Sequence, residues 1–92
     1  METKLDQDRK KIDEIDQQLV KLFEERFKVV EDVIDYKIEN HLPILDQGRE
    51  NVILEKNCNR IENDDIRPYF EKWYREMLKL SKEYQQQVLD EK

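Results

Sequence analysis

Three cationic residues of this chain stand within or beside series of apolar residues at helical spacing. Between residues 12 and 37, apolar residues recur at steps of three and four, and Arg26 and Lys37 fall in that series. Eleven residues of α-helix turn through about 1100°, only about 20° from three full turns, so both side chains point the same way. The third cation, Arg49, precedes another apolar pair by three and four residues, and Glu50 follows it directly.

Two polar residues, Ser81 and Gln85, continue a third series, whose four-residue steps begin with Trp73 and Met77. Burying unpaired cations is costly, and the apolar series offer too few carboxylates to compensate. A bound anion would compensate, since an ion pair at about 4 Å is worth roughly 4 kcal/mol at an effective dielectric constant near 20. The spacing therefore predicts a small anionic ligand held between three helices.

Each of these polar residues also has a simpler interpretation. Arg26 could lie along apolar surface with its guanidinium in water, and Lys37 could stabilise the dipole at a helix end. Asp46 suits the N-cap of a helix, and Arg49 and Glu50 could be ordinary surface residues. The shared placement favours a site, because all of these residues point to one region between the helices.

Arg9 lies too far along the chain to serve the same site. It precedes Arg26 by 17 residues and Lys37 by 28 residues. In a helix these separations are about 25 Å and about 42 Å, so one small ligand cannot touch Arg9 and Lys37 of the same chain. If Arg9 is functional, it serves a second site, which in a two-fold dimer is the site of the partner subunit.

The first helix that must position these residues runs from about Leu5 to about Asn40, a stretch without glycine or proline. At about 1.5 Å per residue it is roughly 50 Å long, more than the rest of the chain can cover. A helix of this length with a continuous apolar seam is typical of packing against another long helix. The seam consists of Ile12, Ile15, Leu19, Leu22, Val30 and Val33.

Two further helices follow. Pro43 ends the first helix, Asp46 caps the second, and the second runs to about Arg60. The segment 63–65 predicts another cap, and Pro68 suits the first turn of the third helix. No strand pattern is present, so we expect an all-α fold with a long, a short and a long helix. The core candidates are Val52, Ile53 and Cys58 in the second helix and Ile66, Phe70, Trp73, Met77, Leu80, Tyr84 and Val88 in the third.

The composition indicates a chain that shares its core with a partner. Of its 92 residues, 37% are hydrophobic and 43% are charged, so a single domain spanning residues 1–92 has a thin core. One glycine and two prolines argue against disorder. Borrowed apolar surface is the better explanation, and a homodimer is its simplest form.

The same composition disfavours several functions. A net charge of −6 disfavours nucleic acid and anionic membranes as partners. Cys58, a core candidate, and His41, a surface candidate, are the only cysteine and histidine, too few for a zinc site. No signal peptide is visible at the start, and no run reaches the roughly 18 apolar residues of a membrane span. We therefore expect a cytoplasmic protein without a metal.

In order along the chain, the segments DRKKIDEIDQQLVKLFEER, YK, LDQGRE and SKEYQQQ resemble the all-helical chorismate mutases. The resemblance covers nearly the whole chain and includes the spacings between Arg9, Arg26, Lys37 and Asp46. It implies an intertwined homodimer of three-helix subunits, with two sites each built from both chains. It also implies the rearrangement of chorismate to prephenate, the step toward phenylalanine and tyrosine, which needs no nucleophile, metal or cofactor.

The resemblance also implies roles for individual residues. Arg26, with Arg9 of the other subunit, would clamp the two carboxylates of the substrate, as bidentate guanidinium groups do well. Lys37 and Gln85 would donate hydrogen bonds to the ether oxygen as its C–O bond breaks. Of three consecutive glutamines, Gln85 is preferred because it shares the stripe of Trp73 and Ser81.

Four more residues would complete the site implied by the resemblance. Glu50 and the backbone of Asp46 would bind the ring hydroxyl, and Arg49 and Ser81 would add carboxylate contacts. Two alternatives stay open: an isochorismate-pyruvate lyase on the same fold, and a non-catalytic dimerisation module whose seam polar residues set the pairing register. No fused dehydratase, dehydrogenase or synthase domain is present, so we expect no end-product feedback from this chain alone.

Overall fold

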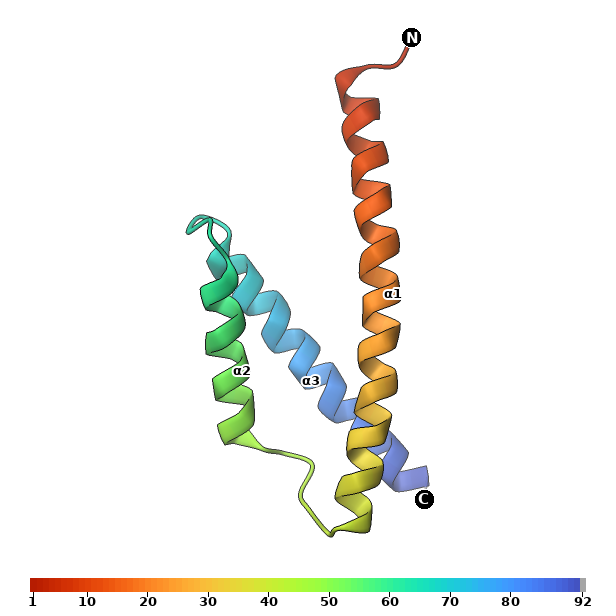
Figure 1. Ribbon diagram of the computed structural model, residues 1–92, viewed down its shortest axis with the longest axis vertical. Helices are drawn as coiled ribbons and strands as arrows, with labels where there is room; N and C mark the ends of the chain where they lie inside the picture. The colour runs from red at the N-terminus through yellow and green to blue at the C-terminus, as the bar shows by residue number, and fades with distance from the viewer. Residues whose placement is uncertain (92) are drawn as a thin grey trace.

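The computed structural model describes residues 1–91 and consists of three helices (Figure 1). They are α1, Lys4–Glu39; α2, Gln47–Arg60; and α3, Arg67–Glu91. No strand occurs within residues 1–91. The predicted all-α fold with a long, a short and a long helix is confirmed, and each predicted helix boundary agrees within a few residues.

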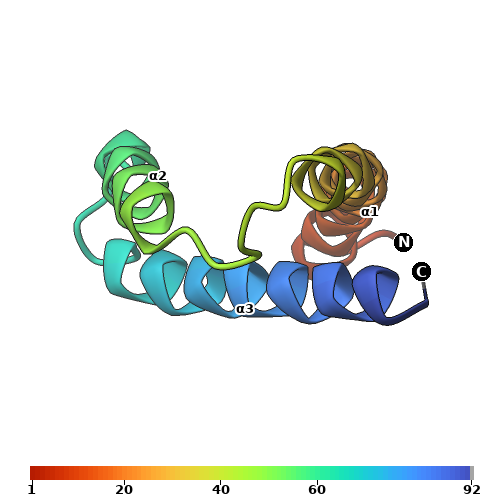
Figure 2. The same ribbon diagram turned by 90° about the horizontal axis from the view of Figure 1, so that it is seen from below.

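The helices α1 and α2 lie on the same side of α3 (Figure 2). The C-terminal half of α1 crosses α3, α2 packs along the first part of α3, and α1 and α2 make no direct backbone contact within residues 1–91. The N-terminal half of α1 extends beyond the other helices, which gives the subunit its 59 × 28 × 15 Å shape. The long helix is thus covered only near its C-terminal end.

The beginnings of the helices carry side-chain caps. Thr3 and Asp6 form a capping box at α1, in which each side chain accepts a hydrogen bond from the backbone of the other. Asp46 caps α2 by accepting from the backbone N–H of Arg49 at 3.0 Å, as predicted. Before α3, the side chain of Asn63 closes a turn, and Pro68 lies in the first helical turn, where its missing N–H costs nothing.

A turn built around His41 ends α1. The N–H groups of His41 and Leu42 donate to the carbonyls of Ile38 and Lys37, at 3.3 Å and 2.8 Å. This is the Schellman arrangement, and it requires His41 to adopt the left-handed region, with φ of 56°. The exposed imidazole agrees with the predicted surface position of His41. The turn sends the chain past Pro43 toward α2.

Replacing His41 with glycine should raise the free energy of unfolding by about 0.5–1 kcal/mol. A left-handed conformation costs an L-residue roughly 1–2 kcal/mol, and glycine avoids this cost. Part of the gain is lost, because glycine gives the unfolded chain more conformational entropy. Urea unfolding at one fixed protein concentration would measure the change. His41→Ala is the matched control, because alanine removes the imidazole but keeps the backbone penalty. Equal stabilisation of both variants would contradict this explanation.

The turn between α2 and α3 is held by Arg67. Its guanidinium donates to the carbonyl of Cys58 at 3.1 Å and to the carbonyl of Ile61, and it pairs with Asp64. These bonds satisfy carbonyl groups at the end of α2 that have no partner within the helix. They also fix how α2 lies along α3, and therefore which α3 residues face the beginning of α2.

The apolar core is small and differs in part from the prediction. Leu54, Tyr74 and Leu78 form its buried centre, and Val30 and Ile34 are the buried residues of α1. The packed flank consists of Ile53, Cys58, Phe70 and Met77, as predicted. The core prediction was wrong for Val52, Ile66, Trp73 and Leu80, which are exposed in the subunit.

The correction in α3 has a simple geometric cause. The buried residues of α3 are Tyr74, Leu78, Ser81 and Gln85. The last two are as predicted, but in the first half of the helix the buried positions are one residue later than the predicted Trp73 and Met77. One residue corresponds to about 100° of rotation, so Trp73 and Leu80 lie to the side of the buried face and are exposed, although Trp73 keeps a ring contact with Phe70.

Candidate active site

A hollow of about 530 Å³ lies where the C-terminal halves of α1 and α3 meet the beginning of α2. Its volume suits a small-molecule ligand. One wall is apolar and consists of Leu22, Val29, Val30, Val33, Ile44, Ile53 and Leu78. The polar lining consists of Glu25, Arg26, Asp46, Arg49, Glu50, Ser81 and Gln85. An apolar wall with a few polar groups is the usual composition of such a pocket.

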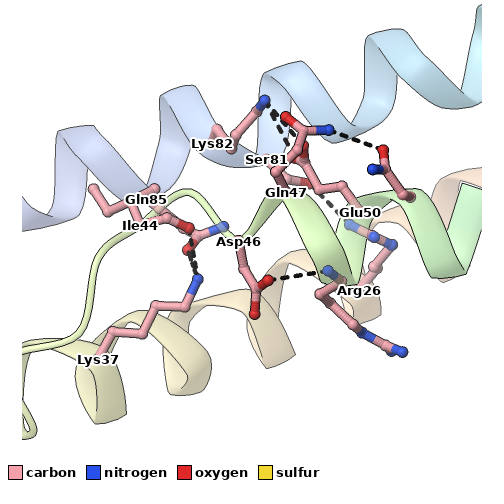
Figure 3. Close-up of polar contacts among 11 residues, drawn as sticks. Arg26, Lys37, Ile44, Asp46, Gln47, Glu50, Ser81, Lys82 and Gln85 are labelled. Carbon is pink, nitrogen blue, oxygen red and sulfur yellow. Dashed lines mark hydrogen bonds and ion pairs between the residues drawn. The ribbon is translucent and has the colours of Figure 1, made fainter.

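Lys37 and Gln85 meet beside the hollow, which Gln85 lines and Lys37 does not (Figure 3). The ammonium of Lys37 donates to the side-chain carbonyl oxygen of Gln85 at 3.2 Å and to the backbone carbonyl of Ile44 at 2.7 Å. An ammonium carries three donors, so one remains for a ligand. Because the carbonyl end of the Gln85 amide accepts from Lys37, its NH₂ end is the one suited to donate to a ligand.

Gln85 is distinguished from its two neighbours by burial. Its side chain lines the hollow and the residue is 7% exposed, whereas Gln86 and Gln87 are exposed. Those two donate to Asp90 and Glu91, each one turn further along α3. Of the three consecutive glutamines, Gln85 is therefore the one that faces the candidate site.

Arg26 and Ser81 form a second polar pair across the hollow. One guanidinium nitrogen of Arg26 donates to the hydroxyl of Ser81 at 2.8 Å, which links α1 to α3 (Figure 3). Ser81 is 4% exposed and Arg26 is half-buried. The guanidinium has five donors in a planar fork, so most of its donors remain for a carboxylate.

The beginning of α2 brings three predicted residues to the same hollow. Asp46 and Arg49 are exposed at its edge, and the Asp46 carboxylate is engaged by the backbone N–H of Arg49. Glu50 is half-buried and forms an ion pair with Lys82 of α3, with 3.2 Å between the ammonium and the carboxylate. The convergence of cationic and polar residues from three helices, which the spacing indicated, is present in the fold.

Arg9 does not join this group. It lies on the exposed N-terminal half of α1, 17 residues before Arg26, which corresponds to about 25 Å along the helix. The described structure therefore agrees with the expectation that Arg9 cannot reach the site of its own chain.

Sequence reasoning missed three contributors to the site. Lys82 follows Ser81 directly, and only the packing of α2 on α3 reveals that it faces Glu50. The carbonyl of Ile44 is a backbone group, so no residue pattern could have indicated that it binds Lys37. Glu25 lines the hollow but stands beside the apolar series rather than in it, which gave no signal.

A hydroxyl–carboxylate contact joins α1 and α3 next to the site. Tyr84 donates to the carboxylate of Glu31, and this hydrogen bond, with the nearby negative charge, raises the pKa of Tyr84 above its usual value. The ring of Tyr84 also packs on Phe27, with 5.3 Å between the ring centroids. These contacts hold α3 against α1 immediately before Gln85.

Within residues 1–91, no group of three or more histidine, cysteine, aspartate or glutamate residues could hold a metal ion. No helix in the same part of the chain is long and apolar enough to cross a membrane. Every fully buried side-chain nitrogen or oxygen described there has a hydrogen-bond partner.

The fold and hollow define a class: an all-α protein with a polar candidate site for a small molecule between its three helices. Comparison with known proteins gives the particular family. Residues 8–86 match the family model described as chorismate mutase type II. A relative named chorismate mutase, from Methanocaldococcus jannaschii, is 36% identical over 94 residues, covering 96% of this chain and 90% of the relative. The chain belongs to the type II chorismate mutase family, a family of isomerases. No solved structure gave a significant match.

Proposed function

We propose that this protein rearranges chorismate to prephenate in the hollow between its three helices. The observation that carries the proposal is the meeting of Lys37 and Gln85 beside the Arg26–Ser81 pair, in a chain of this family. A dicarboxylate substrate would pair with the guanidinium of Arg26, whose partner in the chain is the uncharged hydroxyl of Ser81. The step belongs to the formation of phenylalanine and tyrosine.

The reaction is an intramolecular exchange of bonds. The ether C–O bond breaks while a C–C bond forms, and no proton or group leaves the molecule. As the C–O bond breaks, the oxygen gains negative charge, to which Lys37 and the NH₂ group of Gln85 can donate. Donors fixed before the reaction stabilise such developing charge without reorganisation. The bonds of Lys37 to Gln85 and to Ile44 hold both donors in place.

Binding in a compact conformation supplies the second part of the mechanism. Arg26, oriented by Ser81, is proposed to hold one substrate carboxylate, with Arg49 near the edge of the hollow. Arg9 of a second subunit is proposed to hold the other carboxylate. Fixing both ends of the substrate in the reactive, chair-like form lowers the entropic part of the barrier. Glu50 and the backbone of Asp46 are proposed to bind the ring hydroxyl.

An intertwined homodimer is part of the proposal, and the exposed seam of α1 supports it. Ile12, Ile15 and Leu22 are more than half exposed, and Leu19 is 47% exposed. Ile12 and Ile15 lie on the N-terminal half of α1, which extends beyond the other two helices (Figure 1). A continuous apolar stripe of this kind indicates an interaction surface, and a second copy would bring the same stripe. The predicted cytoplasmic location and the single domain stay predictions.

The wild-type protein should convert chorismate to prephenate faster than the uncatalysed background. The loss of the ultraviolet absorbance of chorismate gives the rate, and NMR identifies the product. Absence of turnover by folded, dimeric protein would contradict the proposal. Isochorismate offered in a parallel assay separates the alternatives: salicylate and pyruvate would indicate the lyase, and no reaction with either substrate would indicate a dimerisation module.

A further inference from the structure

Lys82 lies on the far side of Glu50 from the candidate active site. Glu50 borders two hollows: the one described above, and a smaller one of about 200 Å³ between α2 and α3 that Lys82 also lines. Lys82 does not line the larger hollow. Its ammonium therefore reaches the Glu50 carboxylate from the side of the smaller hollow, and Figure 3 shows the contact between the two side chains.

The contact between the two residues involves both carboxylate oxygens. The ammonium of Lys82 lies 3.2 Å from one oxygen of Glu50 and 3.3 Å from the other. The side chain of Glu50 is 17% exposed and that of Lys82 is 36% exposed. Because the Glu50 side chain is the less exposed of the two, this ion pair is screened less by solvent than a pair at the surface.

A carboxylate in this hollow presents an electrostatic difficulty. The proposed substrate is a dianion, and an uncompensated Glu50 would repel it, since like charges a few ångströms apart disfavour each other. Arg26 and Arg49 line the hollow, but they are proposed to bind the substrate carboxylates and do not pair with Glu50. A cation that pairs with Glu50 from the smaller hollow offsets its charge and leaves the larger hollow open.

We propose that Lys82 is a positioning residue: it fixes the Glu50 carboxylate at the border of the candidate site, where the remaining lone pairs can accept from the ring hydroxyl of the substrate, and it offsets the charge of Glu50. The inference rests on the proposed function, and it deepens that function by naming a residue that acts through Glu50. Lys82 itself touches no substrate. Its loss therefore weakens substrate binding more than it slows the bond rearrangement.

Lys82→Gln should raise KM for chorismate by about three- to tenfold and change kcat by less than about twofold, as expected for loss of a partly buried ion pair. Lys82→Arg should restore most of the affinity, because it keeps the charge and the reach. Lys79→Gln is the matched control: it removes the same charge from an exposed position one turn earlier on α3. Control kinetics should stay close to wild type.

A double-mutant cycle with Glu50→Gln tests the proposed route of action. If Lys82 acts through Glu50, Lys82→Gln should cause little further loss of kcat/KM in the Glu50→Gln background. Wild-type KM for Lys82→Gln, or equal losses in both backgrounds, would overturn the proposal. A loss matched by Lys79→Gln would also overturn it, because the effect would then be long-range charge alone. Wild-type turnover, measured first, shows separately whether the proposed function itself fails.

Discussion

Lys37→Ala should lower kcat for the chorismate rearrangement by about 100- to 1000-fold, the usual effect of removing one fixed donor to a developing oxyanion. KM should change much less, because the negative charge on the ether oxygen develops in the transition state and not in the bound substrate. Lys37 is suited to this role because two of its donors are fixed by Gln85 and the carbonyl of Ile44, which aims the third. Steady-state kinetics give both constants.

The Lys37 variant needs a check on its fold, because its loss leaves two acceptors without their donor. Circular dichroism and the free energy of unfolding should show a folded protein, with a loss of stability of about 1–3 kcal/mol at most. Lys28→Ala, an exposed lysine nine residues earlier on α1, is the matched control and should keep its activity. Gln85→Ala should resemble Lys37→Ala. Wild-type turnover in both Lys37→Ala and Gln85→Ala would refute the assignment of the ether-oxygen donors.

Mixing two inactive variants, Arg9→Ala and Lys37→Ala, should restore activity through shared sites. In the proposed dimer, each site takes Arg9 from one chain and Lys37 from the other. A heterodimer then has one site with both residues and one with neither. With random exchange, half of the dimers are mixed, so about a quarter of all sites are intact. The residual activity of the unmixed variants sets the baseline, and each has lost at least one hydrogen bond to a charged group. Relative to their average, the activity of the mixture should rise roughly five- to fiftyfold.

The control for this experiment uses two residues that the subunit itself brings together. Lys37 and Gln85 lie 3.2 Å apart in one chain, so a heterodimer of Lys37→Ala and Gln85→Ala has no intact site and should stay inactive. The chains are exchanged by unfolding in urea and refolding together, and native mass spectrometry verifies the heterodimers. Verified heterodimers without recovered activity would show that Arg9 does not serve the site of the partner. A monomeric mass for the wild-type protein would rule out the dimer altogether.

The sequence by itself determined where the helices lie and which polar residues stand on their otherwise apolar faces. Proline positions and the Asp46 cap set the boundaries, because these effects act within one or two turns of the chain. The spacing of Arg26 and Lys37 fixed their common face, because the helix repeat alone relates residues on one element. The separation of Arg9 excluded it from the same site for the same reason.

Only the tertiary structure decided which side chains meet across helices. It buried Gln85 instead of Gln86 or Gln87, and it buried Tyr74 instead of Trp73. It also brought Lys82 into an ion pair with Glu50, and the Ile44 carbonyl to Lys37. These contacts depend on the rotation and crossing of whole helices and on the path of the loop between them. Periodicity within a single helix gives the direction of a side chain, but it carries no information about the partner that lies there.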